Sequence, residues 1–140
     1  MHYSAIMHSI TIQPEDVFQS LADETRLRII RLMMATAEES CLCELVDSLL
    51  EPSYKLSRHL KILRQAGLLS SRKEGRWVYH RLVLAPSYLE TLYATVKALP
   101  DQKGIYSADL ERFRERLCLR EGGRCQVGIQ SDEFKAEEVR

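Results

Sequence analysis

Several features that would place a protein in a membrane or outside the cell are missing from this sequence. No apolar run approaches the ~18 residues that a membrane-spanning helix needs. The first residues, MHYSAIMHSITIQ, do not form the basic segment followed by an apolar segment that marks a secretory signal peptide. Internal repeats and low-complexity tracts are also absent. We therefore expect a cytoplasmic protein that has no membrane partner.

Cysteine is scarce, with four residues in a chain of 140. A reducing cytoplasm keeps such cysteines as thiols, which leaves metal or metalloid binding, redox sensing and simple burial as their uses. A hydrophobic content of 45% is enough for a real core, and the length fits one domain. We expect this domain to occupy residues 14–99, between an N-terminal tail of residues 1–13 and a C-terminal region of residues 100–140.

Net charge is lacking over the whole chain, but positive charge is concentrated in one stretch. Residues 53–81, which we call the basic stretch, contain eight basic side chains and one acidic side chain, so their formal charge is +7. Because the whole chain is neutral, the remaining residues carry a formal charge of −7. Positive charge gathered in this way is typical of a local phosphate-binding surface rather than of a generally basic protein.

The basic stretch also predicts a helix, a turn and a β-hairpin. Leu56, Leu60 and Leu63 are spaced to lie on one helical face, and Gly67 suits a left-handed C-cap. The hairpin is predicted from two strand-like segments, at residues 70–74 and 76–82. An amphipathic helix with a solvated basic face beside an ordinary hairpin is one interpretation. The order of helix, glycine and basic hairpin favours a winged helix-turn-helix, in which the helix enters the major groove of DNA.

Further helices are predicted before the basic stretch. One begins at Pro14, and a second is capped by Asp23. A short third helix over residues 41–50, capped by Ser40, forms the helix-turn-helix pair with the basic helix. The predicted fold class is therefore mainly α with a small β-hairpin.

After the hairpin, residues 87–99 predict a long helix with a broad apolar stripe. This stripe either packs on its own subunit or forms a dimer interface, and we favour a homodimer because DNA sites for such proteins are usually paired half-sites. Residues 108–119 predict a shorter, charged helix. Residues 120–140 are expected to form a flexible, cysteine-containing tail that is hinged at two glycines.

Three segments of the chain carry motifs of a known family: residues 21–29 (LADETRLRI), residues 56–68 (LSRHLKILRQAGL) and residues 72–82 (RKEGRWVYHRL). Together they closely resemble the ArsR/SmtB family of metal-sensing repressors. The resemblance covers residues 14–99. It implies a homodimeric winged helix that binds double-stranded operator DNA without ligand and releases it when metal binds.

Residues 41–45, with the sequence CLCEL, resemble the arsenical-sensing Cys-x-Cys motif of the same family. Some arsenical repressors carry a further cysteine three residues after the second one, where this chain has Val46. The zinc-sensing branch uses acids and histidines on the dimer helix, where this chain offers Glu90 and Asp101 but no histidine. The resemblance therefore implies arsenite or antimonite as the inducer, with no organic cofactor.

The thiols of Cys41 and Cys43 suit a soft metal or metalloid ion, because thiolates select soft ions over magnesium or calcium. Trivalent arsenic and antimony favour three sulfurs in a pyramid. Side chains at i and i+2 of a regular helix point about 200° apart, so these two thiols share one ion only if the first turn is distorted. We expect this distortion to move the basic helix. The alternative is that both are small buried residues without a ligand.

Cys125 is the expected third metal ligand, because it lies in a glycine-hinged tail and Arg124 beside it favours the thiolate. Residues 117–127 also resemble the C-terminal tail of some arsenical repressors of the family. Cys118 is expected to face the core and remains a reserve ligand.

The residues expected to bind DNA lie at the start of the basic helix and at the tip of the hairpin. Recognition helices present their N-terminal residues to base edges and phosphates, and the hairpin tip, or wing, acts through phosphates. The predicted DNA-binding residues are Tyr54, Lys55, Ser57, Arg58, His59, Lys61, Lys73 and Arg76.

Two other functions compete with a metalloid-responsive repressor. One is a redox or reactive-sulfur sensor of the same fold, in which two cysteines form a disulfide. The other is a small thiol oxidoreductase, against which stand the lack of a paired general base near Cys41 and the lack of a βαβ redox pattern. We therefore do not expect an enzyme.

Overall fold

The computed structural model of the chain describes residues 11–138, and the side chains as far as residue 135. Its elements, in chain order, are α2 (Pro14–Leu21), α3 (Glu24–Thr36), β1 (Ser40–Cys41), α4 (Leu42–Leu49), α5 (Ser53–Gln65), β2 (Leu69–Glu74), β3 (Trp77–Leu82), α6 (Tyr88–Ala98), α7 (Ile105–Leu117) and α8 (Asp132–Glu138). This arrangement confirms the predicted class of mainly α structure with a small β-hairpin. Most of the predicted N-terminal tail lies outside the described residues.

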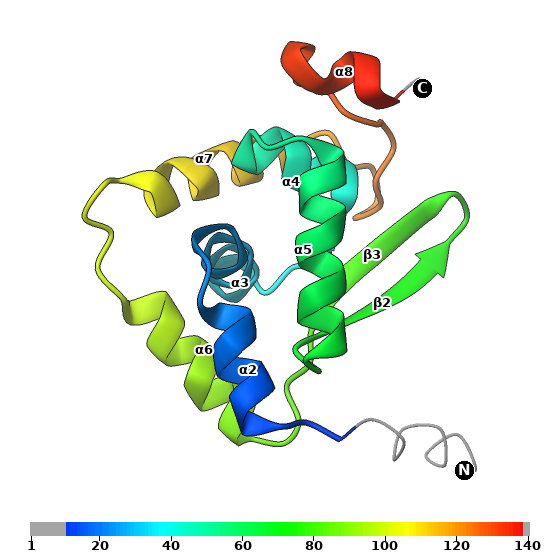
Figure 1. Ribbon diagram of the computed structural model, residues 1–140. Coiled ribbons are helices and arrows are strands. Elements are labelled where there is room, and N and C mark those ends of the chain that lie inside the picture. The colour runs from blue at the N-terminus through cyan, green and yellow to red at the C-terminus, as the bar shows by residue number, and fades with distance from the viewer. Residues whose placement is uncertain (1–10, 139–140) are drawn as a thin grey trace.

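Helix α3 occupies the centre of the molecule. Figure 1 shows it nearly end-on, with α6 and α7 on one side and α5 and the hairpin of β2 and β3 on the other. Its Ile29, Ile30 and Met33 side chains are almost completely buried. Burial of such a side chain contributes about 1.5–3 kcal/mol, so α3 is held in place by the elements around it.

The first two helices begin where the sequence predicts. Pro14 opens α2, at a position where a backbone N–H would have no partner within the helix. The Asp23 carboxylate accepts a hydrogen bond from the Arg26 N–H at 3.1 Å and so caps α3. Local capping chemistry is therefore sufficient to place both starts.

The start of α4 differs from the prediction, and the difference changes the placement of a cysteine. We expected a helix over residues 41–50 capped by Ser40, but Cys41 itself is the N-cap and has an extended backbone. The Cys41 N–H donates to the Glu44 carboxylate at 3.0 Å, which completes a capping box. Ser40 and Cys41 also form β1, so the predicted two-stranded hairpin becomes a three-stranded antiparallel sheet in the order β1-β3-β2.

Helix α5 follows the predicted pattern. The buried side chains on its inner face include Leu56, Leu60 and Leu63. Gly67 ends the helix in the left-handed conformation, with φ of 89°, and the Leu68 N–H donates to the Leu63 carbonyl as in a Schellman motif. A Cβ atom at Gly67 would also lie 2.8 Å from the Cγ1 atom of Ile12, so the position is closed to larger residues.

The apolar stripe of α6 packs inside its own chain. Leu89, Tyr93 and Val96 are buried, and α6 lies against α3. Leu92 is only partly buried, and Leu99 is 40% exposed. Of the two interpretations of this stripe, packing on its own subunit accounts for its three most buried residues.

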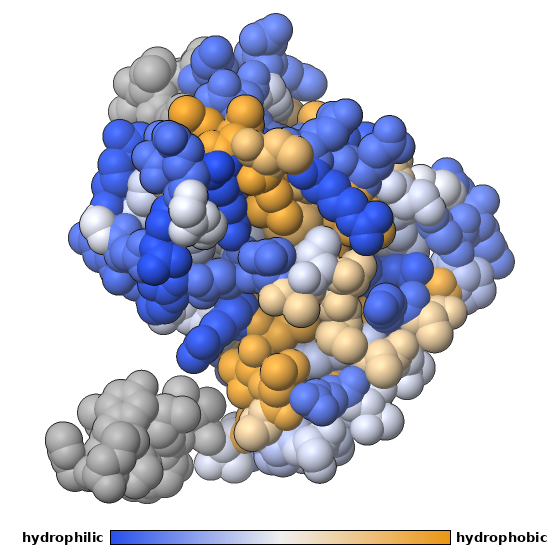
Figure 2. Space-filling view, turned by 180° about the vertical axis from the view of Figure 1, so that it is seen from behind, coloured by the Kyte–Doolittle hydropathy of each residue, from blue (hydrophilic) through white to orange (hydrophobic). Residues whose placement is uncertain are grey.

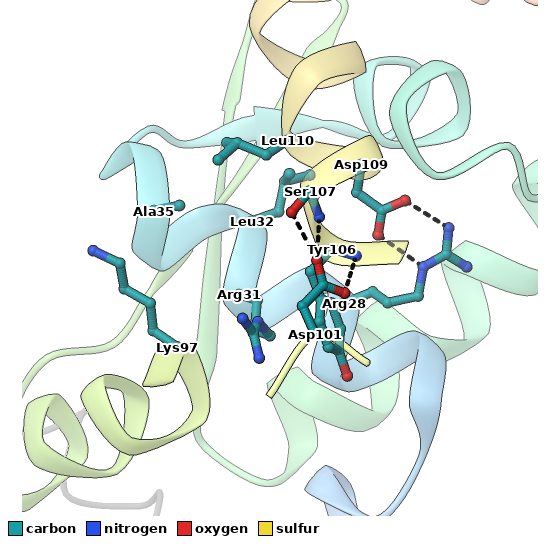
Figure 3. Close-up of a pocket in the computed structure, with 10 residues that line it drawn as sticks. All are labelled: Arg28, Arg31, Leu32, Ala35, Lys97, Asp101, Tyr106, Ser107, Asp109 and Leu110. Carbon is teal, nitrogen blue, oxygen red and sulfur yellow. Dashed lines mark hydrogen bonds and ion pairs between the residues drawn. The ribbon is translucent and has the colours of Figure 1, made fainter. Parts of the chain in front are cut away.

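Helix α7 begins almost a turn earlier than predicted, directly after its N-cap Gly104, and the Asp101 side chain binds the N–H groups of its first turn. The Asp101 carboxylate accepts the N–H groups of Tyr106 and Ser107 at 3.1 and 3.0 Å (Figure 3). Figure 3 also shows Arg28 of α3 reaching Asp109 of α7, with its Nε and Nη2 atoms each 2.9 Å from a carboxylate oxygen. These contacts join α7 to α3.

Residues 120–140 were expected to form a flexible tail, and the part that the structure describes contacts α4 and the thiol side of the molecule. Cys125 is only 1% exposed. The Asp47 carboxylate of α4 accepts the N–H groups of Gln130 and Ser131 at 2.9 and 2.8 Å. Composition suggested flexibility because it does not reveal that a distant carboxylate binds these backbone amides.

The face opposite to that of Figure 1 carries a band of hydrophobic side chains between hydrophilic areas (Figure 2). Large hydrophobic side chains that stay exposed in a single chain include Phe18 of α2 and Tyr88 of α6, at 64% and 50%. Apolar patches of this kind often mark contact surfaces. Among the described residues, no helix has the length and apolar character needed to cross a membrane.

Candidate DNA-binding surface and thiol cluster

The outer face of α5 presents most of the predicted DNA-binding residues to solvent. The exposed ones are Tyr54, Ser57, Arg58 and Lys61. Lys55 is half-buried, because its ammonium group lies 2.7 Å from the Glu51 carboxylate. This face combines positive charge with an aromatic and a hydroxyl group, a set that suits both phosphates and base edges.

His59 does not belong to this exposed face. Its side chain is buried, and its Nδ1 atom lies 3.0 Å from the Arg26 guanidinium and 3.8 Å from the Asp23 carboxylate. Burial lowers the pKa of its imidazole, and the charge of Arg26 adds to this effect. The predicted direct DNA contact is therefore corrected: the ring joins α5 to α3. The spacing signals this, because His59 lies three positions after Leu56 and shares its buried face.

The tip of the hairpin presents the two predicted wing residues, Lys73 and Arg76, both of which are exposed. The Arg76 guanidinium lies 4.4 Å from the centre of the Trp77 ring, a cation–π contact that holds it at the tip. Trp77 in turn pairs with Glu74 across the turn between β2 and β3. The wing thus offers two exposed cations at a defined turn.

The positive charge of Arg72 is already compensated within the protein. Its guanidinium forms ion pairs with Glu39 and Glu74, and it lies 4.7 Å from the centre of the Tyr79 ring. These contacts join β2 to the segment before β1. The charge of the basic stretch is therefore not all available for phosphate.

Three cysteines meet in a buried group beside the start of α4, which we call the thiol cluster: Cys41, Cys43 and Cys125. The Sγ atoms of Cys43 and Cys125 are 3.7 Å apart, although the residues are 82 positions apart in the chain. The Sγ atoms of Cys41 and Cys125 and a carboxylate oxygen of Glu44 all lie within 4.8 Å of one another. The expected distortion of α4 is not needed, because Cys41 precedes the helix with an extended backbone.

The three thiols differ in acidity. Hydrogen bonding to Cys43, followed by burial, raises the pKa of Cys41 far above its usual value. The same hydrogen bond lowers the pKa of Cys43, and the positive charge of Arg116 acts in the same direction. Burial, together with the charge of Cys43, raises the pKa of Cys125 to about 11. Of the three thiols, only Cys43 has a lowered pKa, so it is the one that ionises first.

Sequence reasoning missed two residues that hold the thiol cluster together, Glu44 and Arg120. Glu44 is fully buried, and both of its carboxylate oxygens accept hydrogen bonds from the Arg120 guanidinium, at 2.7 and 2.8 Å. Arg120 also donates to the Glu39 carbonyl at 2.7 Å. The capping-box position signals Glu44, but no local pattern signals Arg120, whose partner lies 76 positions away.

The cation beside the thiol cluster is Arg116 of α7, and not Arg124 as expected. Arg116 pairs with Asp47 at 2.5 Å and is 4% exposed. Its buried Nη1 atom has no hydrogen-bond partner among the residues that the structure describes. Arg124 instead forms an ion pair with Glu74 of the wing.

The reserve ligand Cys118 lies apart from the other three cysteines. It is exposed at the C-cap of α7, where its thiol donates to the Arg114 carbonyl at 3.4 Å. The expectation that it faces the core was wrong. The buried face of α7 includes Phe113 and Arg116, and a residue two positions after Arg116 points to the other side of the helix.

The central part of the chain matches the model of a known protein family. A family model described as "Bacterial regulatory protein, arsR family" matches residues 23–71. This segment begins at the cap of α3, includes α4 and α5, and ends within β2. It therefore contains the helix-turn-helix pair and two of the three clustered cysteines.

Individual relatives match a longer part of the chain than the family model does. The "Arsenic resistance transcriptional regulator ArsR2" of Pseudomonas putida is 47% identical over 89 residues, which are 62% of this chain and 76% of that protein. The "Arsenical resistance operon repressor" of Escherichia coli is 48% identical over 69 residues, which are 49% of this chain and 58% of that protein. A second Pseudomonas putida protein, "Arsenic resistance transcriptional regulator ArsR1", is 48% identical over 71 residues, 51% of this chain and 55% of that protein.

Proposed function

The chain belongs to the arsR family of bacterial regulatory proteins, and on this basis we propose that it is a DNA-binding transcriptional repressor that releases its operator when trivalent arsenic or antimony binds. The thiol cluster is the observation that carries the proposal. Cys41 and Cys43 lie at the start of the first helix of the helix-turn-helix pair, and Cys125 reaches them from the C-terminal segment. A buried group of three thiols beside a DNA-binding unit suits a regulator that responds to a soft trivalent ligand.

DNA binding is assigned to α5 and the wing. Arg58 has the planar donor group that makes bidentate contacts to guanine in the major groove, and it is fully available on the outer face of α5. Lys73 and Arg76 at the wing suit phosphates. The supporting residues on α5 are Tyr54, Lys55, Ser57 and Lys61. His59 supports the helix from its buried side.

The thiol cluster fits a soft trivalent ligand by its donor set, because the buried Cys125 sulfur lies 3.7 Å from the Cys43 sulfur and within 4.8 Å of the Cys41 sulfur. When bound, the metalloid supplies a soft centre that takes three thiolates. Cys43 gives up its proton first, for the reasons given above. Each thiol proton leaves with one hydroxide of arsenous acid as water, so that three thiols give three sulfur–arsenic bonds and three waters. Before the ligand binds, the positive charge of Arg116 favours the thiolate form of Cys43.

We expect DNA to be released because the ligand favours a form of the protein that differs from the DNA-binding form. Closing three sulfurs around one ion draws Cys125 and Cys43 together, and Cys43 lies on α4, which packs on α5. A ligand shifts the population of the two forms by no more than its difference in affinity for them. A near-complete switch requires ~5.5 kcal/mol of preference, which several sulfur bonds can supply.

We expect the repressor to act as a homodimer through α6 with help from α2. The exposed side chains that support this proposal are Phe18, Tyr88 and Leu99, and Leu92 is partly buried. Val96 is 4% exposed and belongs to the core of one chain, so a charge there would test folding and not assembly. The variant Leu92→Asp should be monomeric in light scattering and lose operator binding, with its circular dichroism unchanged. A Leu92→Asp protein that stays dimeric would contradict this interface.

A gel-shift titration tests the proposed function. The probe is the DNA upstream of the chain's own coding sequence, and the ligands are arsenite, antimonite and zinc, each added to the reduced complex. Arsenite and antimonite should release the DNA at lower concentration than zinc. Failure to bind the upstream duplex, or release by zinc alone, would contradict the proposal. Cys125→Ser should need more arsenite for the same release, because two thiols hold the ligand more weakly than three.

A redox-sensing repressor is the second candidate function, and the 3.7 Å between the Sγ atoms of Cys43 and Cys125 favours it. A disulfide needs a sulfur–sulfur distance of about 2.05 Å, so a small movement would suffice. The two thiols would lose two electrons and two protons to hydrogen peroxide, which becomes two waters. Under this alternative, peroxide releases the DNA without any metalloid, and dithiothreitol restores binding. Under the metalloid proposal, release needs arsenite and occurs in fully reduced protein.

A further inference from the structure

Arg124 and Cys125 are neighbours in the chain but contact two different parts of the molecule. Cys125 is 1% exposed and belongs to the thiol cluster. The Arg124 side chain is 54% exposed, and its guanidinium forms an ion pair with Glu74. Glu74 is the last residue of β2, beside the wing tip. Two consecutive residues therefore connect the thiol cluster with the wing.

A short turn produces this arrangement. Glu121 and Arg124 exchange two backbone hydrogen bonds of 3.0 Å across a pair of glycines, both of which have positive φ. The Cys125 N–H then donates to the Tyr79 hydroxyl at 2.8 Å. Because Tyr79 lies on β3, the segment is bound to the wing at two points, by the Arg124 side chain and by the Cys125 backbone.

The partner of Arg124 is the only acidic residue in the basic stretch, Glu74. A carboxylate between Lys73 and Arg76 repels the phosphates that these residues are expected to bind. Residues 72–76, taken with Glu39, carry a formal charge of +1, and Arg124 raises this charge to +2. The C-terminal segment therefore doubles the net positive charge at the wing.

We infer that Arg124 belongs to the DNA-binding surface, held on the wing by Glu74, and that this ion pair links the thiol cluster to DNA binding. The inference rests on the proposed function and deepens it, because it names the wing as the element on which the ligand acts. It adds to the wing a residue outside the winged helix-turn-helix unit itself.

The thiol protons explain how ligand binding reaches Arg124. The Cys43 and Cys125 thiols both donate to the Val127 carbonyl, at 3.6 and 3.5 Å. When both sulfurs bond to arsenic, their protons leave as water, so both hydrogen bonds to this carbonyl are lost. The segment around Cys125 then loses two of the contacts that hold it, and a different position becomes favourable. Arg124 moves with its neighbour, and the Glu74 carboxylate is then exposed to the DNA phosphates.

The variant Arg124→Ala tests the first half of the inference, with Arg114→Ala as the matched control. Arg114 is another exposed arginine, on α7. At equal salt, Arg124→Ala should bind the upstream duplex about three- to tenfold more weakly, with a salt slope reduced by up to about one unit. Arg114→Ala should bind like the wild type. Adding Glu74→Gln to Arg124→Ala should recover part of the loss. Equal affinities of the two single variants would overturn the inference.

Arsenite tests the second half. The readout is the ratio of the Kd for the duplex with arsenite to the Kd without it. If ligand binding already removes Arg124 from the wing, wild type and Arg124→Ala have the same Kd in saturating arsenite. The ratio should therefore be smaller for Arg124→Ala than for the wild type. The factor should equal the one by which this variant binds the duplex more weakly without arsenite. An unchanged ratio would overturn the link. A wild-type protein that does not bind the duplex, or ignores arsenite, would instead contradict the proposed function.

Discussion

Arginines serve the DNA-facing side and the thiol side of this molecule in different ways. On α5 and the wing, Arg58 and Arg76 are exposed, and both come from the basic stretch. Around the thiols, the side chains of Arg116 and Arg120 are only 4% and 7% exposed, and each pairs with a carboxylate far away in the sequence. The first kind of arginine keeps its charge available for a partner. The second kind forms ion pairs within the protein, so its charge is not available to a partner.

The comparison shows that the two sides contribute differently to stability. An exposed charge costs little to remove, because water already solvates it. A buried ion pair contributes little net stability when intact, but removal of one partner leaves an uncompensated charge out of water. The thiol side should therefore be sensitive to single substitutions that the DNA-facing side tolerates.

The largest expected effect is on the free energy of unfolding of Arg120→Met. This change leaves the fully buried Glu44 carboxylate without its guanidinium partner, so the free energy of unfolding should fall by about 3–5 kcal/mol. The control Arg58→Met should change it by less than about 0.5 kcal/mol. Urea unfolding of the wild type and the two variants measures both changes in the free energy of unfolding. Similar losses in the two variants would remove the distinction between buried and exposed arginines.

The pH dependence of stability tests whether the buried His80 side chain is shielded from water. Burial lowers the pKa of its imidazole to about 4, whereas an unfolded chain has a histidine pKa of about 6.5. Above pH 6.5 the residue is neutral in both the folded and the unfolded state, so its protonation does not affect stability. As the pH falls from 6.5 towards 4, only the unfolded state takes up the proton, so stability should drop by up to about 3 kcal/mol. His80→Gln should show a smaller drop in this range. Identical pH profiles would mean that His80 is solvated.

The third effect concerns DNA affinity alone. Arg58→Ala should weaken binding to the upstream duplex by about 1–3 kcal/mol, because one bidentate base contact is lost. Its urea unfolding should match that of the wild type. Binding to a random duplex of the same length should change much less. An Arg58→Ala protein that binds the upstream duplex normally at matched salt would show that α5 is not the recognition helix.

The smallest effect is expected at the wing. Lys73→Ala and Arg76→Ala should each weaken binding to all duplexes alike and lower the salt slope by about one unit. The measurement is the Kd at several salt concentrations for the upstream and the random duplex. Loss of discrimination between the two duplexes with an unchanged slope would assign these residues to base recognition instead.

The DNA-facing side could be predicted from the sequence because its contacts are local. The leucine spacing and Gly67 define α5 and its end within one short segment. The error at His59 was avoidable, since its position relative to Leu56 already places it on the inner face. The roles of the exposed residues in DNA binding stay predictions.

The thiol side could be predicted only in part. Residue type and a glycine-containing tail indicated Cys125, and the structure brings it to Cys43, but its role as a ligand stays a prediction. The extended backbone of Cys41 depends on the pairing of β1 with β3, which local periodicity does not report. Arg116 and Arg120 have partners 69 and 76 positions away, so no local pattern reveals them.

Release of operator DNA from the double variant Cys41→Ser/Cys43→Ser tests the central role of the thiol cluster most directly. The serines preserve size and leave α5 and the wing intact, so the variant should bind the upstream duplex as tightly as the wild type. With two of the three sulfurs gone, arsenite should no longer release the DNA at concentrations that empty the wild-type complex. Normal release by arsenite from this variant would contradict the assignment and place the sensing site elsewhere.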